Sequence, residues 1–195
     1  MTFPWSASLL IAGLVVTQEV PYERSDGSWL DAPTEWRFSN AELLRGQPEG
    51  PNSTCDPTTR ASRSAAERLL TEAGWKLRLD TEVNRTAERS IEIVQAFRQF
   101  DGMCRSLQAQ AFVFVNNGLI GVLSPKLMNA RKDGDLADVV VSGSGEIRAK
   151  FFRYGQADAL CCPSRESLAV YSVMLEGDTN ILRLLRVDTR PRTVP

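Results

Sequence analysis

The 195-residue sequence contains no histidine. Histidine is the only side chain whose unperturbed pKa lies near neutral pH, and it is the usual general base and the commonest metal ligand. Nucleophilic sites of the Ser-His-Asp and Cys-His kinds are therefore excluded. A zinc site would have to use Cys, Asp and Glu alone. Carboxylate-based hydrolysis and Ser-Lys chemistry remain open.

The chain also lacks an excess of charge of either sign. Its 23 basic residues are interspersed with 24 acidic ones, and the net charge is -1. Nucleic-acid binding depends on many unopposed Lys and Arg side chains, so no nucleic-acid partner is expected. The hydrophobic content of 43% is too high for disorder and suits one sizeable core.

An uncharged apolar run extends from Ala7 to Val16. It has the length of the hydrophobic region of a signal peptide and is short for a membrane span. Neither Lys nor Arg precedes it, and Val15-Val16-Thr17 is a poor cleavage site. We expect residues 1–17 to be a signal segment, with a buried strand or a weak membrane anchor as alternatives.

The following stretch, from Pro21 to Pro57, is rich in Pro, Gly, Asp and Ser. This composition predicts an irregular arm over residues 18–55, with one short strand at Glu35–Phe38. Residues 56–195 are then expected to form a single α+β domain.

Two helices are predicted at the start of this domain. Good helix formers fill Ala61–Ala73, Asp56-Pro57-Thr58-Thr59 offers N-cap candidates, and Gly74 is a plausible C-terminal stop. In Ala87–Phe100, the residues Ile91, Val94 and Phe97 share one helical face. The β-branched residues there make a strand the competing interpretation.

Three hairpins are predicted after the helices. Their turns are Asn116-Asn117-Gly118, Gly143-Ser144-Gly145 and Glu176-Gly177-Asp178, and Asn-Gly favours a type I′ turn. Their strands are Ala111–Val115, Leu119–Leu123, Val139–Ser142, Glu146–Tyr154, Leu168–Leu175 and Ile181–Val187. We therefore expect an antiparallel β-meander of about six strands with the two N-terminal helices packed on one side.

The four cysteines are Cys55, Cys104, Cys161 and Cys162. In an exported chain, an even count favours two disulfides. Because a bridge between adjacent residues would strain the peptide, we expect Cys161 and Cys162 each to reach back to Cys55 or Cys104. A Cys-only metal site and a thiol redox site are the alternatives, and both lack Cys-x-x-Cys spacing.

Charged residues near predicted turns give the remaining candidates. Asp101, Arg105, Arg131, Arg153 and Arg165 are candidates for a combined Arg/Asp binding patch. Asp133-Gly134-Asp135 resembles a fragment of a calcium loop, although turn chemistry explains it equally well. A carboxylate-dependent hydrolase would draw on Asp101, Asp133, Asp135 and Asp158. No catalytic residue, metal or cofactor is indicated.

Several segments resemble the LppP/LprE lipoprotein family. Phe112-Val113-Phe114-Val115-Asn116-Asn117-Gly118-Leu119-Ile120-Gly121 is similar to its central hairpin, and Cys161-Cys162-Pro163-Ser164 is similar to its Cys-Cys-Pro-Ser segment. Phe100-Asp101-Gly102-Met103-Cys104-Arg105 and Gly74-Trp75 resemble versions in cyanobacterial-type relatives. The resemblance implies an exported, envelope-associated domain of uncharacterised activity. The chain departs from that pattern because no lipidation Cys follows its apolar run.

These observations favour a non-enzymatic domain of the periplasm or cell envelope that binds a protein or glycan partner. Peripheral association with a membrane stays open. The alternatives are a carboxylate-dependent hydrolase acting on envelope glycans and a cytosolic Cys-ligated metal protein.

Overall fold

The computed structural model describes residues 27–33, 61–77, 90–101, 105–159 and 161–193. The predicted signal segment, the strand predicted at Glu35–Phe38, the proposed N-cap residues 56–59, and both Cys55 and Cys104 lie outside these ranges. No helix in the described ranges is long and apolar enough to cross a membrane.

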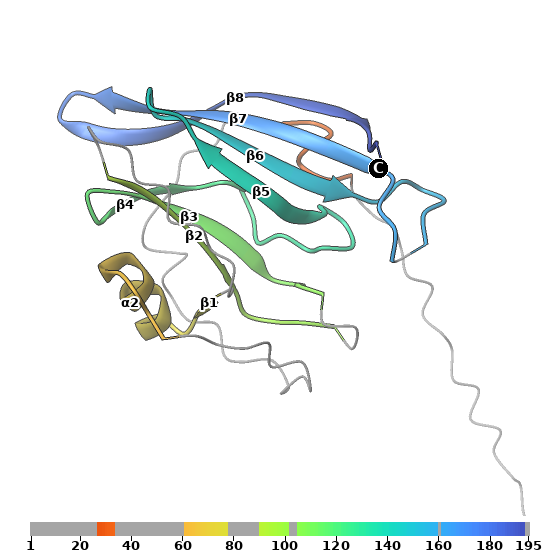
Figure 1. The fold of residues 1–195 in the computed structure, drawn as a ribbon, viewed down its shortest axis with the longest axis horizontal. Coiled ribbons are helices and arrows are strands. Elements are labelled where there is room, and N and C mark those ends of the chain that lie inside the picture. Colours follow the sequence, from red (N-terminus) through yellow and green to blue (C-terminus); the bar gives the residue numbers. More distant parts are fainter. Residues whose placement is uncertain (1–26, 34–60, 78–89, 102–104, 160, 194–195) are drawn as a thin grey trace, which may run out of the picture.

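The described chain forms two four-stranded antiparallel sheets and one short helix (Figure 1). The first sheet has the order β1-β2-β3-β4, and the second has the order β5-β6-β7-β8. The helix is α2, Ala65–Glu72, and the strands of the first sheet are β1 Lys76–Leu77, β2 Ile91–Phe97, β3 Ala109–Val115 and β4 Gly118–Val122. The second sheet contains β5 Asp135–Val141, β6 Glu146–Arg153, β7 Arg165–Glu176 and β8 Thr179–Pro191.

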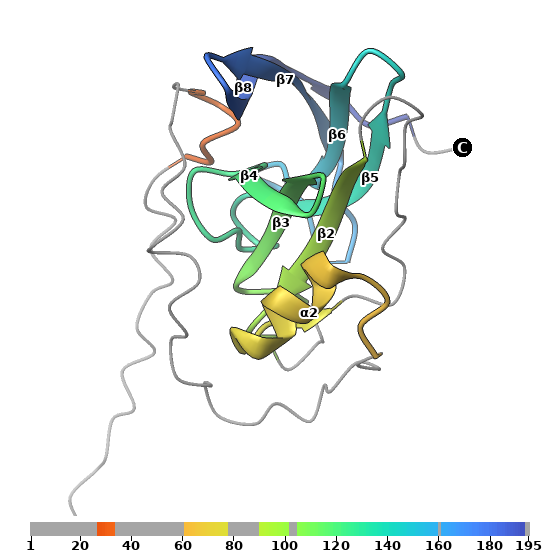
Figure 2. The ribbon, with the colours of Figure 1, turned by 90° about the vertical axis from the view of Figure 1, so that its left-hand side faces the viewer.

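These elements form three layers, with α2 on one face of the first sheet and the second sheet on the other (Figure 2). Alternate residues of each inner strand point to opposite faces. In β2, Ile91 and Ile93 join the core between the sheets, whereas Val94 and Ala96 pack toward α2. The first sheet is therefore the middle layer and is apolar on both faces.

The prediction of two helices beside one six-strand meander is wrong. Ile91–Phe97 is strand β2, paired along its length with β3. Its apolar residues imitate a helical face because a strand in a middle layer is apolar on both sides. The strands also divide into two sheets, because β4 is followed by a loop that leads to β5 in the other layer.

Other local predictions are confirmed. All six predicted strand segments lie in or overlap β3 to β8. The first turn lies where it was predicted, but its central pair is Asn116-Asn117, both with positive φ as a type I′ turn requires, and Gly118 is the first residue of β4. The helix begins later than predicted because the Ser64 side chain accepts a hydrogen bond from the Glu67 backbone N–H at 3.1 Å. It ends at Glu72 with Ala73 as its C-cap, and the following Gly74 has a φ of +84°, which permits the stop.

One tyrosine ties the two sheets together. Tyr171 of β7 is fully buried, and its hydroxyl donates to the carbonyl of Leu123 at 2.5 Å. Burial raises the pKa of Tyr171 well above its ordinary value. The hydroxyl therefore stays protonated and keeps its role as donor.

Candidate functional site

The first of two Arg–Asp clusters is built around Asp101. Its Oδ2 accepts hydrogen bonds from Arg105 Nε at 2.8 Å and from Arg131 at 3.1 Å from Nε and 2.8 Å from NH2. The Asp101 side chain is 7% exposed, that of Arg105 14%, and that of Arg131 31%. The buried carboxylate thus fixes two guanidinium groups, and Arg131 is the more accessible.

Local backbone structure places this cluster. The loop after β2 folds back so that the Asp101 N–H donates to the Arg105 carbonyl at 3.0 Å. The Arg105 N–H in turn donates to Asp101 Oδ1 at 3.0 Å. The hydrogen bond to Asp101 raises the pKa of Arg105, and a further bond to the Tyr154 side chain contributes.

The second cluster is centred on Asp31. Arg153, whose side chain is only 3% exposed, donates to Asp31 at 2.7 and 3.2 Å and to the Ser167 hydroxyl at 3.1 Å. Arg165 lies 3.8 Å from Asp31. The hydrogen bond from Arg153 is the main cause that lowers the pKa of Asp31, so this carboxyl group is ionised at neutral pH.

The predicted combined patch therefore exists as two clusters. Asp101, Arg105 and Arg131 come together, whereas Arg153 and Arg165 join Asp31. Both clusters lie at the end of the molecule that holds the β6–β7 loop, because Arg105 bonds to Tyr154, the residue after Arg153. We call this region the loop end. Sequence reasoning missed Asp31, which is 122 residues from Arg153 in the chain.

The β6–β7 loop carries a disulfide between the adjacent residues Cys161 and Cys162. Both residues are exposed. The Asp158 carboxylate closes the loop by accepting hydrogen bonds from the N–H groups of Gly155 at 2.6 Å and Ser164 at 2.7 Å. These backbone bonds lower the pKa of Asp158, with a smaller contribution from the charge of Arg165.

The expectation that Cys161 and Cys162 each reach back to Cys55 or Cys104 is therefore wrong. The local turn brings the two side chains together, with the Cys162 N–H bonded to the Ala159 carbonyl at 3.0 Å. The adjacent Cα atoms are 3.8 Å apart, the spacing of an ordinary trans peptide. We predicted that a bridge between adjacent cysteines would strain the peptide, but a local turn accommodates it.

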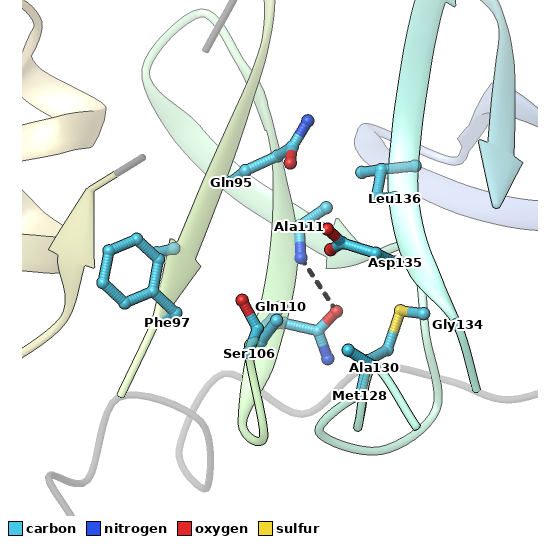
Figure 3. A pocket seen from close by; sticks show the side chains of 12 residues that line it. Gln95, Phe97, Ser106, Gln110, Ala111, Met128, Ala130, Gly134, Asp135 and Leu136 are labelled. Carbon is cyan, nitrogen blue, oxygen red and sulfur yellow. Dashed lines mark hydrogen bonds between the residues drawn. The ribbon is translucent and has the colours of Figure 1, made fainter. Parts of the chain in front are cut away.

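A small hollow lies between the sheets, where β2 and β3 face the start of β5 (Figure 3). Its lining is mostly apolar and includes Phe97, Met128 and Leu136. The volume is about 20 Å³. That is room for roughly one water molecule, whereas small-molecule pockets measure about 300–1,000 Å³. The hollow is therefore too small for a lipid chain or a cofactor.

Asp133 and Asp135 flank the turn at Gly134 that leads into β5. Asp133 is buried and accepts from the Asn129 N–H at 3.1 Å. Gly134 adopts a φ of +87°, and a Cβ there would lie 2.0 Å from the Phe152 carbonyl oxygen. This explains Asp133-Gly134-Asp135 as a turn pressed against β6. Within the described ranges, no three Cys, Asp or Glu side chains are grouped to hold a metal ion.

Comparisons with known proteins return no matching family model, no matching curated protein and no matching solved structure. The resemblance to the LppP/LprE lipoproteins stays a prediction.

Proposed function

We propose that this chain is a non-enzymatic, exported domain of the cell envelope that binds a protein or glycan partner through its loop end. The observation that carries the proposal is the Asp101 cluster, in which one buried carboxylate fixes two guanidinium groups. Binding residues are commonly placed on loops that a rigid scaffold positions.

Charge indicates the chemistry of the partner. Two arginines and one aspartate leave the Asp101 cluster with a formal charge of +1, since 2 − 1 = +1. The second cluster likewise holds two arginines, Arg153 and Arg165, against Asp31, and Asp158 adds a further negative charge near Arg165. Arg131 is the more exposed guanidinium group of the Asp101 cluster, and a guanidinium group suits a carboxylate or phosphate.

Electrostatics makes Asp31 and Asp158 poor candidates for the general acid of a glycosidase. A glycosidase needs one carboxyl group with a raised pKa to act as general acid. The pKa values of Asp31 and Asp158 are both shifted downward, chiefly by hydrogen bonds, so neither carboxyl group is such an acid. They are held as carboxylates, which suits fixed structural charges.

The Cys161–Cys162 disulfide argues against a cytosolic metal-binding role and is compatible with export. Disulfides persist in oxidising compartments and are rare in the cytosol. A bridged pair of cysteines also has no thiolate to offer a metal.

Co-sedimentation with purified cell-wall sacculi tests the partner chemistry. Sacculi that carry phosphate-rich polymers are compared with sacculi stripped of them. We expect binding to the first, weakened by salt, and weakened about tenfold by Arg131→Gln, as the loss of a charged hydrogen bond implies. Arg148→Gln is the matched control, because Arg148 is 60% exposed and its ion pair is with the nearby Glu146. Equal binding by both variants, or equal loss, would contradict the assignment.

A further inference from the structure

We propose that the Cys161–Cys162 disulfide is a redox site, which an external dithiol reduces and a disulfide oxidant re-forms while the domain stays folded. This property is separate from partner binding at the Asp101 cluster. Three features of the β6–β7 loop carry the inference: the adjacency of the two cysteines, their exposure, and the independent closure of the loop.

Adjacency means that the bridge does little to hold the fold together. A disulfide stabilises a protein mainly by closing a loop in the unfolded chain, and the effect grows with loop length. Here the two half-cystines are one residue apart, so the bridge encloses no intervening chain. Stabilisation of the domain is therefore a poor explanation for this bond.

The exposure of both cysteines allows a reagent to approach the disulfide. Cys161 and Cys162 lie on the surface, whereas a disulfide that stabilises a fold is commonly buried. Thiol–disulfide exchange requires a thiolate to approach one sulfur directly, so access is a condition of the reaction.

The loop is closed without the disulfide. Asp158 holds the N–H groups of Gly155 and Ser164, and the Ser164 carbonyl accepts from the Arg192 N–H at 2.7 Å. These bonds secure both ends of the segment that carries the cysteines. Reduction therefore changes the loop locally and leaves its attachment to β6, β7 and the chain after β8.

Reduction of the disulfide by an external dithiol takes two exchange steps. One thiolate of the external dithiol attacks one of the two sulfurs, the bond between Cys161 and Cys162 breaks, and the other cysteine leaves as a thiolate. The second thiol of the reagent then resolves the mixed disulfide. The protein gains two electrons and two protons, and the reagent becomes a cyclic disulfide.

Native-state labelling tests this site. The full chain is treated with dithiothreitol and then N-ethylmaleimide without denaturant, and the peptide containing both cysteines is identified by mass spectrometry. We expect two labels on that peptide. We also expect the Cys161→Ser/Cys162→Ser double variant to lower Tm by less than about 2 °C, because little stability depends on the bridge.

A second probe reports on the adjacency of the reduced thiols. Phenylarsine oxide condenses with two neighbouring thiols and releases water, so it should bind the reduced chain with one arsenic atom per chain and block both labels. Either single variant, Cys161→Ser or Cys162→Ser, should lose this block.

Three results would overturn the redox assignment: labelling that needs denaturant, a bridge from Cys161 or Cys162 to Cys55 or Cys104, or a Tm loss above about 5 °C in the double variant. These measurements do not use cell-wall material. Their failure would leave the sacculus-binding proposal standing, and failure of sacculus binding would not affect the redox assignment.

Discussion

At the residue scale, Asp101 is the candidate residue that holds two others in place, Arg105 and Arg131. Its one carboxylate compensates two arginines, and its side chain is only 7% exposed. Removing a partner from a buried ion pair costs much more than removing one at the surface, because an uncompensated charge stays behind. The same residue therefore maintains both the fold of the loop end and the orientation of Arg131.

Asp101→Asn should lower the free energy of unfolding by about 2–3 kcal/mol, because Arg105 and Arg131 lose their anion. Urea unfolding measures the change. Asp188→Asn is the control: Asp188 is 64% exposed and pairs with Arg186 at 3.0 Å, so its loss should cost less than about 0.5 kcal/mol. Similar costs for the two variants would show that Asp101 is not a buried anchor.

Asp31 makes the free energy of unfolding depend on pH in the acid range. Its pKa in the folded protein lies below the ordinary value of an aspartate, chiefly because Arg153 donates a hydrogen bond to it. A depressed folded pKa contributes stability above the unfolded pKa, and this contribution is lost as pH falls through the folded value. Wild-type stability should therefore fall below about pH 4 more steeply than that of Asp31→Asn. Urea unfolding at a series of pH values tests this, and parallel profiles would refute it.

The residues of the loop end show the limit of sequence reasoning at this scale. Loop position alone singled out Asp101, Arg105, Arg131, Arg153 and Arg165, and all five are in ion pairs. Their division into two clusters depends on Asp31, which no local pattern connects to β6. The pairing of Cys161 with Cys162 depends on a turn that spacing does not reveal.

At the scale of elements, the turn at Gly134 determines how the start of β5 meets β6. This glycine has positive φ and lies against the Phe152 carbonyl, so both its conformation and its lack of a side chain are required. The contact also positions Arg153, whose Cδ is near the same site.

Gly134→Ala should lower the free energy of unfolding by about 3 kcal/mol or more, since a left-handed backbone and a backbone clash add together. Gly177→Ala separates the two effects, because Gly177 has a φ of +60° and nothing within 4 Å of an added Cβ. We expect a cost of about 1 kcal/mol there. Chemical denaturation measures both, and equal costs would mean that β5 shifts freely to admit the methyl group.

Hairpins were predictable because their signals are local. The turns at Asn116-Asn117 and Gly177 follow from residues that tolerate positive φ. Strand β2 was not securely predictable, because Ile91, Val94 and Phe97 fit a helical face as well as a doubly covered strand. Only its pairing with β3 and its place under α2 decide between the two.

At the scale of the whole molecule, we expect an exported, disulfide-bonded chain. A non-reducing peptide map with N-terminal sequencing should show the bridge between Cys161 and Cys162 and a first residue after Thr17. Four free thiols together with a retained Met1 would instead place the chain in a reducing compartment.

The three-layer arrangement also sets the order in which parts of the molecule open. Strands β2 and β3 are enclosed by α2 on one side and by the second sheet on the other. Strand β8 lies at the edge of its sheet, and most of its residues are exposed or half-buried. Backbone amides exchange with solvent through local openings, whose free energy is lowest at exposed edges and highest in the core. The amides of β2 and β3 should thus exchange last, and the middle sheet should be the slowest part of the protein to open.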